Sequence, residues 1–521
     1  MVLLLLFIAL LLVGNAGLSL WDQDEAAYAG FGWHMNDMGQ YKIPSFPWSE
    51  VHRKPPFHFW LIALSYKLFG ATEFSTRIPS VLAILATVLI VWGMGKKLLG
   101  EKGATLAALA LMSNILLVAL AKISFTDATL LFFETLALLS LLNWLQTNNT
   151  LYIIWWTVAL AGGMLTKGPP ILIVALGTCG LLFLFKGNRA KAFAGGLLVL
   201  PAIVPIFLWL YSTVEADNGA FATWLLDWYV LKRTSGAVFG QTGPPGYHLA
   251  IGILAFIAVL PWVPGAFGQQ VKATVRGNPV AIVLTGWLFF GWVFYEALPS
   301  KLPTYALAAY PALALCIGKY APQVKIGTLF KILNGLRIGI WLLLGAAPIA
   351  IAGYTGNIIS AVMAVILLGG VAFLLWLGKR SNGNNVVLKF INAFLISALV
   401  MGSVWLFAIP QGEELRSGSK QSVVWMKNHP AKSNVVAMSK NYQLPSWPTY
   451  CAWNGLQFKE LKEEEWKAIY QNRAAGYMVF DDSNIGRFKE FVGNAPLNDK
   501  VINAFISDRG EKVNYHLIKI E

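Results

Sequence analysis

Residues 21–60 have the sequence WDQDEAAYAGFGWHMNDMGQYKIPSFPWSEVHRKPPFHFW and carry charges that the surrounding apolar chain lacks. Four acids occur by position 37, and the cationic run His52-Arg53-Lys54 follows them. The stretch begins directly after an apolar run, residues 2–20, that is long enough as a helix to cross a bilayer. Its dense aromatic residues suit helices that lie in the headgroup region. We therefore predict an interfacial catalytic loop, with a solvated connecting loop as the alternative.

The composition indicates a polytopic membrane protein. Of 521 residues, 56% are hydrophobic and 13% are charged, and the mean hydropathy is +0.58. A soluble protein carries about 25% charged residues. The excess of 40 Lys and Arg over 26 Asp and Glu is typical of cytoplasmic loops beside anionic headgroups, and no basic run interleaved with aromatics indicates nucleic-acid binding. The three cysteines favour neither a disulfide framework nor a thiolate metal site.

Apolar runs separated by polar residues, Gly or Pro predict about thirteen transmembrane helices. The expected spans are 2–20, 77–95, 104–121, 125–145, 151–166, 169–185, 193–211, 249–268, 279–295, 303–318, 335–353, 357–377 and 388–409. Basic residues fall in alternate loops, which the positive-inside rule places in the cytoplasm together with the N-terminus. The loops 21–76 and 212–248 are then external.

The chain changes to soluble character near residue 410. We therefore expect a transmembrane domain, residues 1–409, and a small external α/β domain, residues 410–521. Helical periodicity and short apolar or alternating runs indicate the elements of this second domain. The expected helices are 411–429 and 461–471, and the expected strands are 434–437, 477–480 and 515–520.

Cations in the external loops predict an anion site. Lys167 and Lys301 break the positive-inside pattern, and an anionic ligand would supply their partner. Arg233, next to Lys232, is a candidate phosphate clamp. The alternatives are that the two lysines snorkel to the outer headgroups and that the pair at 232–233 is solvated. His248, where the chain re-enters the membrane, is a candidate ligand or acid/base group, or a hydrogen-bonded structural residue.

The motif content favours lipid-borne substrates. The sequence contains no Walker loop, dinucleotide glycine pattern, HExxH or Cys/His cluster, so nothing indicates nucleotide-driven chemistry or a strong metal site. An outer-face carboxylate beside aromatics and cations suits group transfer from a phosphate-linked lipid. The acid deprotonates an acceptor hydroxyl, and the cations stabilise the departing phosphate.

Several short motifs occur along the chain in a fixed order. The first set is Asp24-Glu25-Ala26-Ala27-Tyr28, Gly39-Gln40-Tyr41-Lys42-Ile43-Pro44, Lys54-Pro55-Pro56, Trp60, Leu68-Phe69-Gly70 and Arg77. This ordered set resembles the opening of the protein-mannosyltransferase-like GT-C glycosyltransferases. The later motifs are Ser124-Phe125-Thr126-Asp127, Thr166-Lys167-Gly168, Pro299-Ser300-Lys301-Leu302-Pro303-Thr304-Tyr305 and Tyr310-Pro311. They resemble the bacterial branch that includes the lipid A aminoarabinose transferases.

The resemblance implies a GT-C fold and an inverting transferase that uses a polyprenyl-phosphate sugar, undecaprenyl in bacteria, at the periplasmic face of the inner membrane. It implies catalytic roles for Asp24 as the base, for the neighbouring Glu25 and for Asp127 as a second acid near the acceptor. It also implies substrate-binding residues, of which Lys54, Arg233 and Lys301 form the cationic donor pocket. The other substrate-binding candidates are Tyr28, Arg53, Lys167, His248 and Tyr305.

One position of this sequence departs from the pattern of the family that it resembles. The aminoarabinose transferases typically have an acid immediately before the Lys-Pro pair, implicated in a metal site with a His, whereas this chain has Arg53. A divalent metal ion is therefore an open alternative, and Arg53 is an alternative phosphate contact. The acceptor is open among lipid A, another envelope glycan, a glycolipid and a protein.

Two functions of other kinds are alternatives to the transferase. A transporter or flippase for polyprenyl-linked lipids would also carry intramembrane charges, but transporters favour midplane charges and repeated halves, and this sequence shows no repeat. An oligosaccharide ligase or polymerase of similar topology is the other alternative. Release of free polyprenyl phosphate from a monosaccharide donor separates the transferase from both.

Overall fold

The computed structural model describes residues 1–228, 241–380, 385–439, 444–493, 498–506 and 511–520. The chain forms two units, and each is described by itself. The membrane unit consists of Met1–Val13, Lys54–His58 and Ile78–Phe407, and the α/β unit consists of Gly14–Arg53, Phe59–Arg77 and Ala408–Glu521.

The predicted domain boundary differs from this division, because most of the opening loop folds with the C-terminal residues. Leu20 and Ala26 are buried in the same hydrophobic core as Val423 and Trp447. The carboxylate of Asp22 accepts hydrogen bonds from the Ser446 backbone N–H at 2.9 Å and from the Ser446 hydroxyl at 2.7 Å. The expected 410–521 domain is therefore completed by residues more than 300 positions earlier in the sequence, a distance over which local patterns carry no information.

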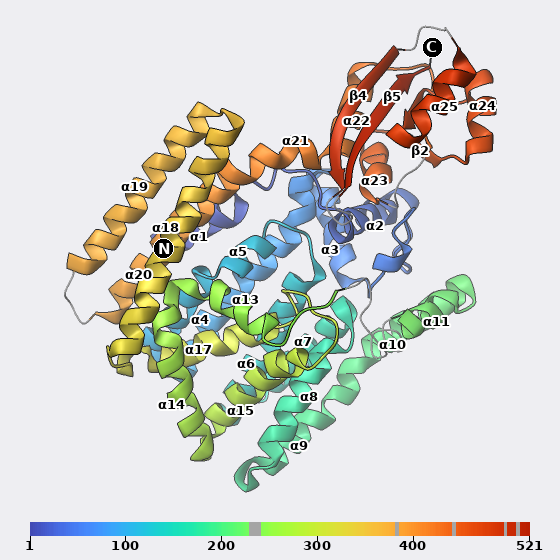
Figure 1. Ribbon diagram of the computed structural model, residues 1–521. Helices are drawn as coiled ribbons and strands as arrows, with labels where there is room; N and C mark the ends of the chain where they lie inside the picture. The colour runs from blue at the N-terminus through green and yellow to red at the C-terminus, as the bar shows by residue number, and fades with distance from the viewer. Residues whose placement is uncertain (229–240, 381–384, 440–443, 494–497, 507–510, 521) are drawn as a thin grey trace. The chain divides into compact units, whose positions relative to one another are not determined.

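The membrane unit is built from α-helices with short 3-10 or π turns between them (Figure 1). Its helices are α1 Val2–Leu12, α4 Glu73–Met112 (which begins in the α/β unit), α5 Ile115–Leu120, α6 Thr126–Thr147, α7 Leu151–Lys167, α8 Pro170–Phe183, α9 Arg189–Leu197, α10 Val199–Asp217, α11 Ala220–Leu226, α13 Tyr247–Ala255, α14 Val263–Val275, α15 Pro279–Leu288, α16 Phe294–Glu296, α17 Tyr310–Tyr320, α18 Thr328–Thr355, α19 Ile358–Arg380 and α20 Val386–Ser403. The short turns are η2 Lys186–Asn188, η5 Ile257–Trp262, η6 Phe289–Val293, η7 Leu307–Ala309, η8 Ala321–Gln323 and η9 Val404–Ala408, which ends in the α/β unit.

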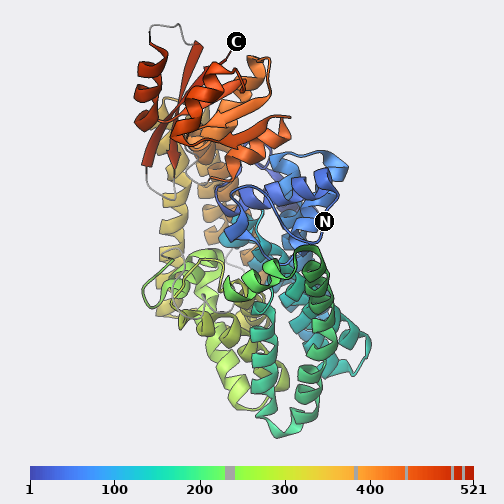
Figure 2. The ribbon, with the colours of Figure 1, turned by 90° about the vertical axis from the view of Figure 1, so that its right-hand side faces the viewer.

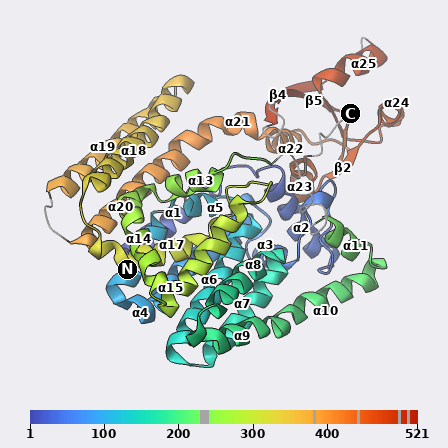
Figure 3. The same cartoon turned by 60° about the horizontal axis from the view of Figure 1, so that its bottom comes forward.

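Helices that follow one another in the sequence pack side by side in this unit. Helices α6, α7 and α8 contact one another, as Figure 3 shows. Helices α18 and α19, separated by a short turn, form a second packed pair, which Figures 1 and 2 show in gold. Short connections between apolar helices favour such antiparallel neighbours.

Within the described residues, seven helices are long and apolar enough to cross a membrane, or eight if the bent pair Tyr247–Ala255 and Ile257–Val275 is one span. The seven are Glu73–Met112, Thr126–Thr147, Lys186–Asp217, Pro279–Glu296, Thr328–Thr355, Ile358–Gly378 and Val386–Arg416. Shorter apolar helices are Val2–Leu12, Phe57–Phe69, Leu151–Lys167 and Pro170–Phe183. The chain is thus a multi-pass helical membrane protein, and the count of about thirteen crossings stays a prediction.

The first predicted span is wrong in its length, because helix α1 ends at Leu12 instead of Leu20. The side chain of Lys122, which is 1% exposed, donates hydrogen bonds to the carbonyl oxygens of Leu10 at 2.6 Å and Leu11 at 2.9 Å. Carbonyls in the last turn of a helix have no partner within the helix, and a cation satisfies them. Gly14, with a φ of +80°, then turns the chain out of the helix.

The predicted interruption between spans 77–95 and 104–121 is confirmed. Gly100 has a φ of +71° and a ψ of 173°, which breaks the helical path inside α4. A residue with a side chain rarely adopts this φ, so glycine permits the bend. The charged residues Lys96, Lys97 and Lys102 flank it.

The α/β unit contains a five-stranded mixed sheet with the strand order β2-β1-β3-β5-β4. Its strands are β1 Val435–Met438, β2 Gln457–Glu460, β3 Tyr477–Phe480, β4 Asn498–Ile506 and β5 Glu511–Lys519. Strand β1 pairs in parallel with β2 and β3, whereas β5 pairs antiparallel with β3 and β4. The helices of this unit are α2 Asp24–Met38, α3 Phe57–Phe69 (which begins in the membrane unit), α21 Glu413–Arg416, α22 Gly418–Asn428, α23 Ser446–Trp453, α24 Glu463–Gln471 and α25 Asp482–Val492, with turns η1 Glu50–His52 and η10 Ile409–Gly412.

Helices cover both faces of this sheet. Side chains alternate between faces along a strand, so Val436 faces one core and Ala437 faces the other. The first core also contains Trp447 from α23, and the second contains Trp466 from α24 and Phe488 from α25. The three predicted strands, at the positions of β1, β3 and β5, are confirmed. Strands β2 and β4 were not predicted, because they form the sheet edges and β2 is largely exposed.

Candidate active site

Asp24 is the first residue of α2 and forms a close pair with His52. The distance between Asp24 Oδ1 and His52 Nδ1 is 2.7 Å. The side chain of Asp24 is 40% exposed, whereas that of His52 is 8% exposed. The other ring nitrogen of His52, Nε2, lies 3.2 Å from Gln23 Oε1. A buried imidazole therefore orients a carboxylate that solvent and substrate can reach, and the helix N-terminus favours its negative charge.

His52 was not among the predicted site residues. In the sequence it belongs to the cationic run His52-Arg53-Lys54, which indicates charge and not acid/base chemistry. The usable signal was a histidine in the same predicted external loop, 21–76, as a candidate general base, since a base is commonly oriented by a third group. Arg53, the next residue, is partly buried.

Glu25 has a structural role, which corrects its prediction as a catalytic residue. Its side chain and that of Arg77 are both 0% exposed. The Arg77 guanidinium donates to Oε1 at 2.9 Å and to Oε2 at 3.0 Å, and the Trp21 backbone N–H donates to Oε2 at 2.8 Å. Both carboxylate oxygens are thus engaged away from solvent, in the bidentate geometry that arginine favours. The same guanidinium binds the backbone carbonyls of residues 15, 18 and 19.

Tyr28 lies in an aromatic cluster of the α/β unit. It is 1% exposed, and its ring centroid lies 5.1 Å from that of Phe59 and 6.5 Å from that of Phe31. This placement gives Tyr28 a packing role in the structure. Tyr28 therefore lacks the exposure that its predicted contact with substrate requires.

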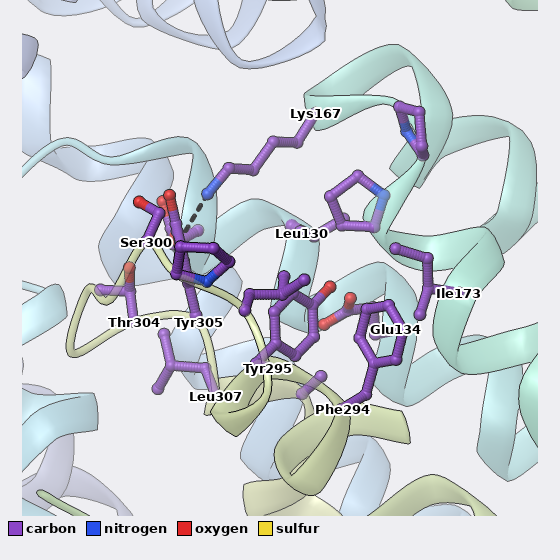
Figure 4. A pocket seen from close by; sticks show the side chains of 16 residues that line it. Leu130, Glu134, Lys167, Ile173, Phe294, Tyr295, Ser300, Thr304, Tyr305 and Leu307 are labelled. Carbon is purple, nitrogen blue, oxygen red and sulfur yellow. Dashed lines mark hydrogen bonds and ion pairs between the residues drawn. The ribbon is translucent and has the colours of Figure 1, made fainter. Parts of the chain in front are cut away.

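A cavity of about 350 Å³ lies in the membrane unit and contains several predicted residues (Figure 4). Asp127, Lys167 and Tyr305 line it, together with Glu134 and Tyr295, which were not predicted. Lys167 Nζ lies 2.8 Å from Asp127 Oδ1, and the two side chains are 10% and 12% exposed. Lys167 also lies 5.6 Å from the centroid of the Tyr305 ring, a cation–π contact. The cavity therefore has a charged end formed by residues from α6, α7 and the 299–305 motif.

Lys54 and His58 lie near this charged end. Lys54 is 5% exposed and interacts electrostatically with Asp127. His58 is 0% exposed, with Nδ1 2.9 Å from Thr129 Oγ1 and Nε2 3.1 Å from Ser124 Oγ. Burial, together with the charge of Lys54, lowers the pKa of His58 to about 3. His58 is therefore a neutral hydrogen-bonding residue at physiological pH.

Glu296 organises two other predicted residues, His248 and Lys301. Its carboxylate accepts from the backbone N–H of Gly246 at 2.7 Å and lies 3.1 Å from His248 Nδ1. The ammonium of Lys301 binds the Glu296 backbone carbonyl and lies 3.5 Å from Glu296 Oε1. His248 Nε2 donates to the Leu302 carbonyl at 3.0 Å. These contacts agree with the alternative that His248 is a hydrogen-bonded structural residue, and its role as a ligand or acid/base group stays a prediction.

Glu296 was not predicted, although its position three residues before the Pro299–Tyr305 motif was a usable signal. Arg233 lies outside the described residues, so its predicted role is untested by the structure. Among the described residues, no group of three or more His, Cys, Asp or Glu side chains lies together in a way that could hold a metal ion.

Comparisons with known proteins agree with the motif resemblance. Residues 53–209 match the family described as dolichyl-phosphate-mannose-protein mannosyltransferase. An undecaprenyl phosphate-alpha-4-amino-4-deoxy-L-arabinose arabinosyl transferase of Edwardsiella ictaluri is 27% identical over 396 residues, which cover 71% of this chain and 69% of the relative. A second transferase of this name, from Proteus mirabilis, is 27% identical over 327 residues, which cover 61% of this chain and 58% of the relative.

The fold resembles a solved transferase over nearly its whole length. ArnT from Cupriavidus metallidurans in the apo state has a TM-score of 0.75 at 15% identity, with 99% of this chain and 97% of that chain covered. The same protein bound to undecaprenyl phosphate also gives a TM-score of 0.75, at 16% identity. At this identity the likeness shows the fold. The family match, the relatives and the fold agree: the chain is similar to membrane glycosyltransferases, and among them to the aminoarabinose transferases.

Proposed function

We propose that the protein is an inverting glycosyltransferase that moves a sugar from polyprenyl phosphate, undecaprenyl phosphate in bacteria, to an acceptor at the periplasmic face of the inner membrane. The acceptor class is lipid A, another envelope glycan or a protein. The observation that carries the proposal is Asp24, a carboxylate that is 40% exposed and held at 2.7 Å by the buried His52. The fold supports it, because the related ArnT was solved with undecaprenyl phosphate bound.

In the proposed reaction, the oxygen of an acceptor hydroxyl attacks the anomeric carbon of the donor sugar while Asp24 accepts the hydroxyl proton. The bond between the anomeric carbon and the phosphate oxygen breaks on the opposite face. Its electron pair leaves with polyprenyl phosphate, so one glycosidic bond replaces one glycosyl phosphate bond and the configuration inverts. His52 acts as a positioning residue that holds the Asp24 carboxylate in one orientation.

Lys54 and Lys167 are the described cations that we assign to the leaving phosphate. Both residues are buried, and a charge in such a poorly hydrated place stabilises developing negative charge more than it would in water. Arg233 keeps its proposed part in this pocket. Lys301 keeps its proposed part as well; Glu296 holds it, as Asp127 holds Lys167.

The external position of the α/β unit is part of the proposal and rests on the alternation of basic loops in the sequence. A reporter fused after Glu521 tests it. A reporter that works only in the periplasm should be active, whereas activity only of a cytoplasmic reporter would overturn the orientation.

The activity itself is tested with purified protein in lipid nanodiscs, an undecaprenyl-phosphate pentose and lipid A. Mass spectrometry should detect glycosylated lipid A and free undecaprenyl phosphate in equal amounts. A flippase would move the donor between leaflets of proteoliposomes without cleaving it. Lack of product with lipid A, envelope glycans and proteins from a periplasmic extract would contradict the transferase.

A further inference from the structure

A turn formed by residues 46–49 directly precedes η1, the short helix that carries His52. The Ser49 backbone N–H donates to the Phe46 carbonyl at 3.2 Å, and the His52 backbone N–H donates to the Ser49 carbonyl at 3.0 Å. Two consecutive hydrogen-bonded turns therefore connect Phe46 to His52. Where the imidazole lies beside Asp24 thus depends on how the first of these turns is held.

Trp48 has an unusual backbone conformation in this turn, with a φ of +56°. Proline at the second position, here Pro47, and a positive φ at the third are typical of a type II turn. The third residue of such a turn is usually glycine or asparagine, because a larger side chain is strained there. A bulky residue keeps this conformation only where its surroundings hold it. The contacts of the indole ring must therefore offset the strain.

The indole contacts the edge strand β2. Trp48 Nε1 donates to Glu460 Oε2 at 2.8 Å, and the Trp48 ring centroid lies 4.9 Å from that of Phe458 with the ring planes at 88°. Residues two apart on a strand point to the same side, so Phe458 and Glu460 present one surface to the indole. Edge-to-face contact is a favourable geometry for two aromatic rings. Strand β2 thus holds the third residue of the turn by both a hydrogen bond and a ring contact.

The first residue of the turn is held by a different element, helix α2. Phe46 is 5% exposed, and its ring lies against α2 at Gly30, where a Cβ atom would come within 2.3 Å of Phe46 Cδ1. The turn is therefore held on one side by the helix that begins at Asp24 and on the other side by β2.

One hydrophobic core supports both partners of the Asp24–His52 pair. Ala26, two residues after Asp24, is buried in the core that also contains residues of β1 and β3, and Phe458 packs against the same core. The start of α2 and the anchor of the turn before His52 are thus fixed to one packed body. Close packing of this kind transmits position with little slack, which keeps two side chains at a constant distance.

We propose that Trp48 is a positioning residue for sugar transfer, because it fixes the turn before His52 on β2 and so keeps the imidazole where it holds the Asp24 carboxylate. The inference rests on the proposed function, in which Asp24 is the base. It gives the C-terminal sheet a part in the reaction, since β2 anchors a loop from the opening of the chain.

Variants of Trp48 test the proposal through the separation of kcat from KM. Trp48→Gly removes the indole and relaxes the backbone, whereas Trp48→Phe keeps a ring contact and loses the hydrogen bond. Trp48→Gly should lower kcat by about 5-fold with the donor KM within about 2-fold of wild type, and Trp48→Phe should lose less. Arg473→Gly is the matched control, because Arg473 has a φ of +47° in the same unit, and it should keep the wild-type kcat.

The double variant Trp48→Gly/His52→Ala separates positioning from a general structural role. Residues that act as a unit are not additive, so the double variant should lose no more kcat than His52→Ala alone. Losses that multiply in the double variant would overturn the inference. A wild-type kcat in Trp48→Gly would overturn it as well.

Hydrogen–deuterium exchange, read by mass spectrometry, tests the anchor without using activity. The peptide 46–53 should exchange at least about 10-fold faster in Trp48→Gly than in wild type, while peptides of β1 and β3 keep the wild-type rate. Unchanged exchange in 46–53, or faster exchange throughout the unit, would overturn the inference. If no preparation transfers sugar, the proposed function fails and with it the role of Trp48 in transfer, and the exchange then still shows whether Trp48 anchors the turn.

Discussion

The start of helix α2 presents two neighbouring acids to two different regions of the α/β unit. Asp24 faces a surface region, where it is 40% exposed and pairs with His52. Glu25 faces a core region, where it and Arg77 are 0% exposed. A carboxylate can exchange a proton with a substrate only if the substrate reaches it, whereas a buried carboxylate paired with a guanidinium holds backbone in place. Adjacent residues of the same chemical type are thus divided by burial into a catalytic candidate and a structural one.

The pair in the membrane unit, Asp127 and Lys167, is an intermediate case. Its side chains are 12% and 10% exposed, and they border a cavity instead of a packed core. A pair of this kind remains within reach of a ligand but is too enclosed to exchange freely with water. We therefore expect it to influence substrate binding more than proton transfer.

The largest expected effect follows removal of the buried pair. Changing Glu25→Gln leaves the Arg77 guanidinium without a counter-charge in a fully buried place, and breaking such a pair costs about 3–5 kcal/mol. A protein domain has only about 5–15 kcal/mol of net stability, so the variant should unfold at a much lower temperature or fail to accumulate. Thermal unfolding of the purified protein measures this.

The exposed Asp37 on the same helix provides the matched control for Glu25, and Asp37→Asn should unfold at the wild-type temperature. A Glu25→Gln protein as stable as wild type would contradict the structural role. Burial would then not explain why Glu25 and Asp24 differ in role.

A smaller effect is expected for the intermediate pair. Lys167→Met removes a cation that we assign to the donor phosphate, and a charge-assisted hydrogen bond contributes about 1.5–3 kcal/mol. The dissociation constant for an undecaprenyl-phosphate sugar should rise by about 10-fold or more, as measured by native mass spectrometry. The exposed Lys331 is the control, and Lys331→Met should bind the donor like wild type.

Variants of His52 test the exposed acid of the comparison, Asp24, which His52 contacts. His52→Ala removes the hydrogen-bond donor that holds Asp24, so it should lower kcat by about 10-fold. His52→Asn keeps a donor close to the place of Nδ1, so its loss of kcat should be smaller. KM for the donor should stay within about 2-fold in both variants if His52 positions Asp24 and does not bind donor. A change in KM without a change in kcat would reject the positioning role.

The smallest effect concerns pH and the buried His58. Its pKa is lowered from 6.5 to about 3 in the folded protein, so below pH 6.5 the unfolded chain binds a proton that the folded chain does not. The contribution of neutral His58 to the free energy of unfolding is complete above pH 6.5 and is lost progressively as the pH falls toward 3. Between pH 7 and pH 5.5 the free energy of unfolding should drop by about 1 kcal/mol from this group.

This pH dependence is measured as the denaturation midpoint at both pH values. His58→Gln should show a smaller drop than wild type, because glutamine does not titrate. An identical drop in the two proteins would mean that His58 already titrates normally when folded.

The sequence predicted features that depend on local patterns. Strands β1 and β3 have short buried apolar runs, Gly100 interrupts an apolar helix, and the outer-loop lysines stand out against an apolar background. Each signal lies within a few residues of the feature that it indicates. The ordered motifs also led to Asp24 and Asp127, and the similarity to solved transferases agrees with the fold that they imply.

Features that depend on distant partners were not predictable. Glu25 pairs with Arg77, which lies 52 positions later, and His248 contacts Glu296, which lies 48 positions later. Helix α1 ends early because Lys122 binds its carbonyl oxygens across 112 positions. Periodicity and motif spacing contain no information about such contacts, so the roles of these charged residues required the structure.

The central claim is that Asp24, and not its neighbour, accepts the proton from the acceptor. The most direct measurement is turnover and donor affinity in the same preparation of Asp24→Asn, with Asp37→Asn as the control on the same helix. A positioned general base contributes ~10²–10⁴-fold, so Asp24→Asn should lose at least about 100-fold in kcat while its donor dissociation constant stays within about 2-fold of wild type. Near-normal turnover of a folded, donor-binding Asp24→Asn protein would contradict the account.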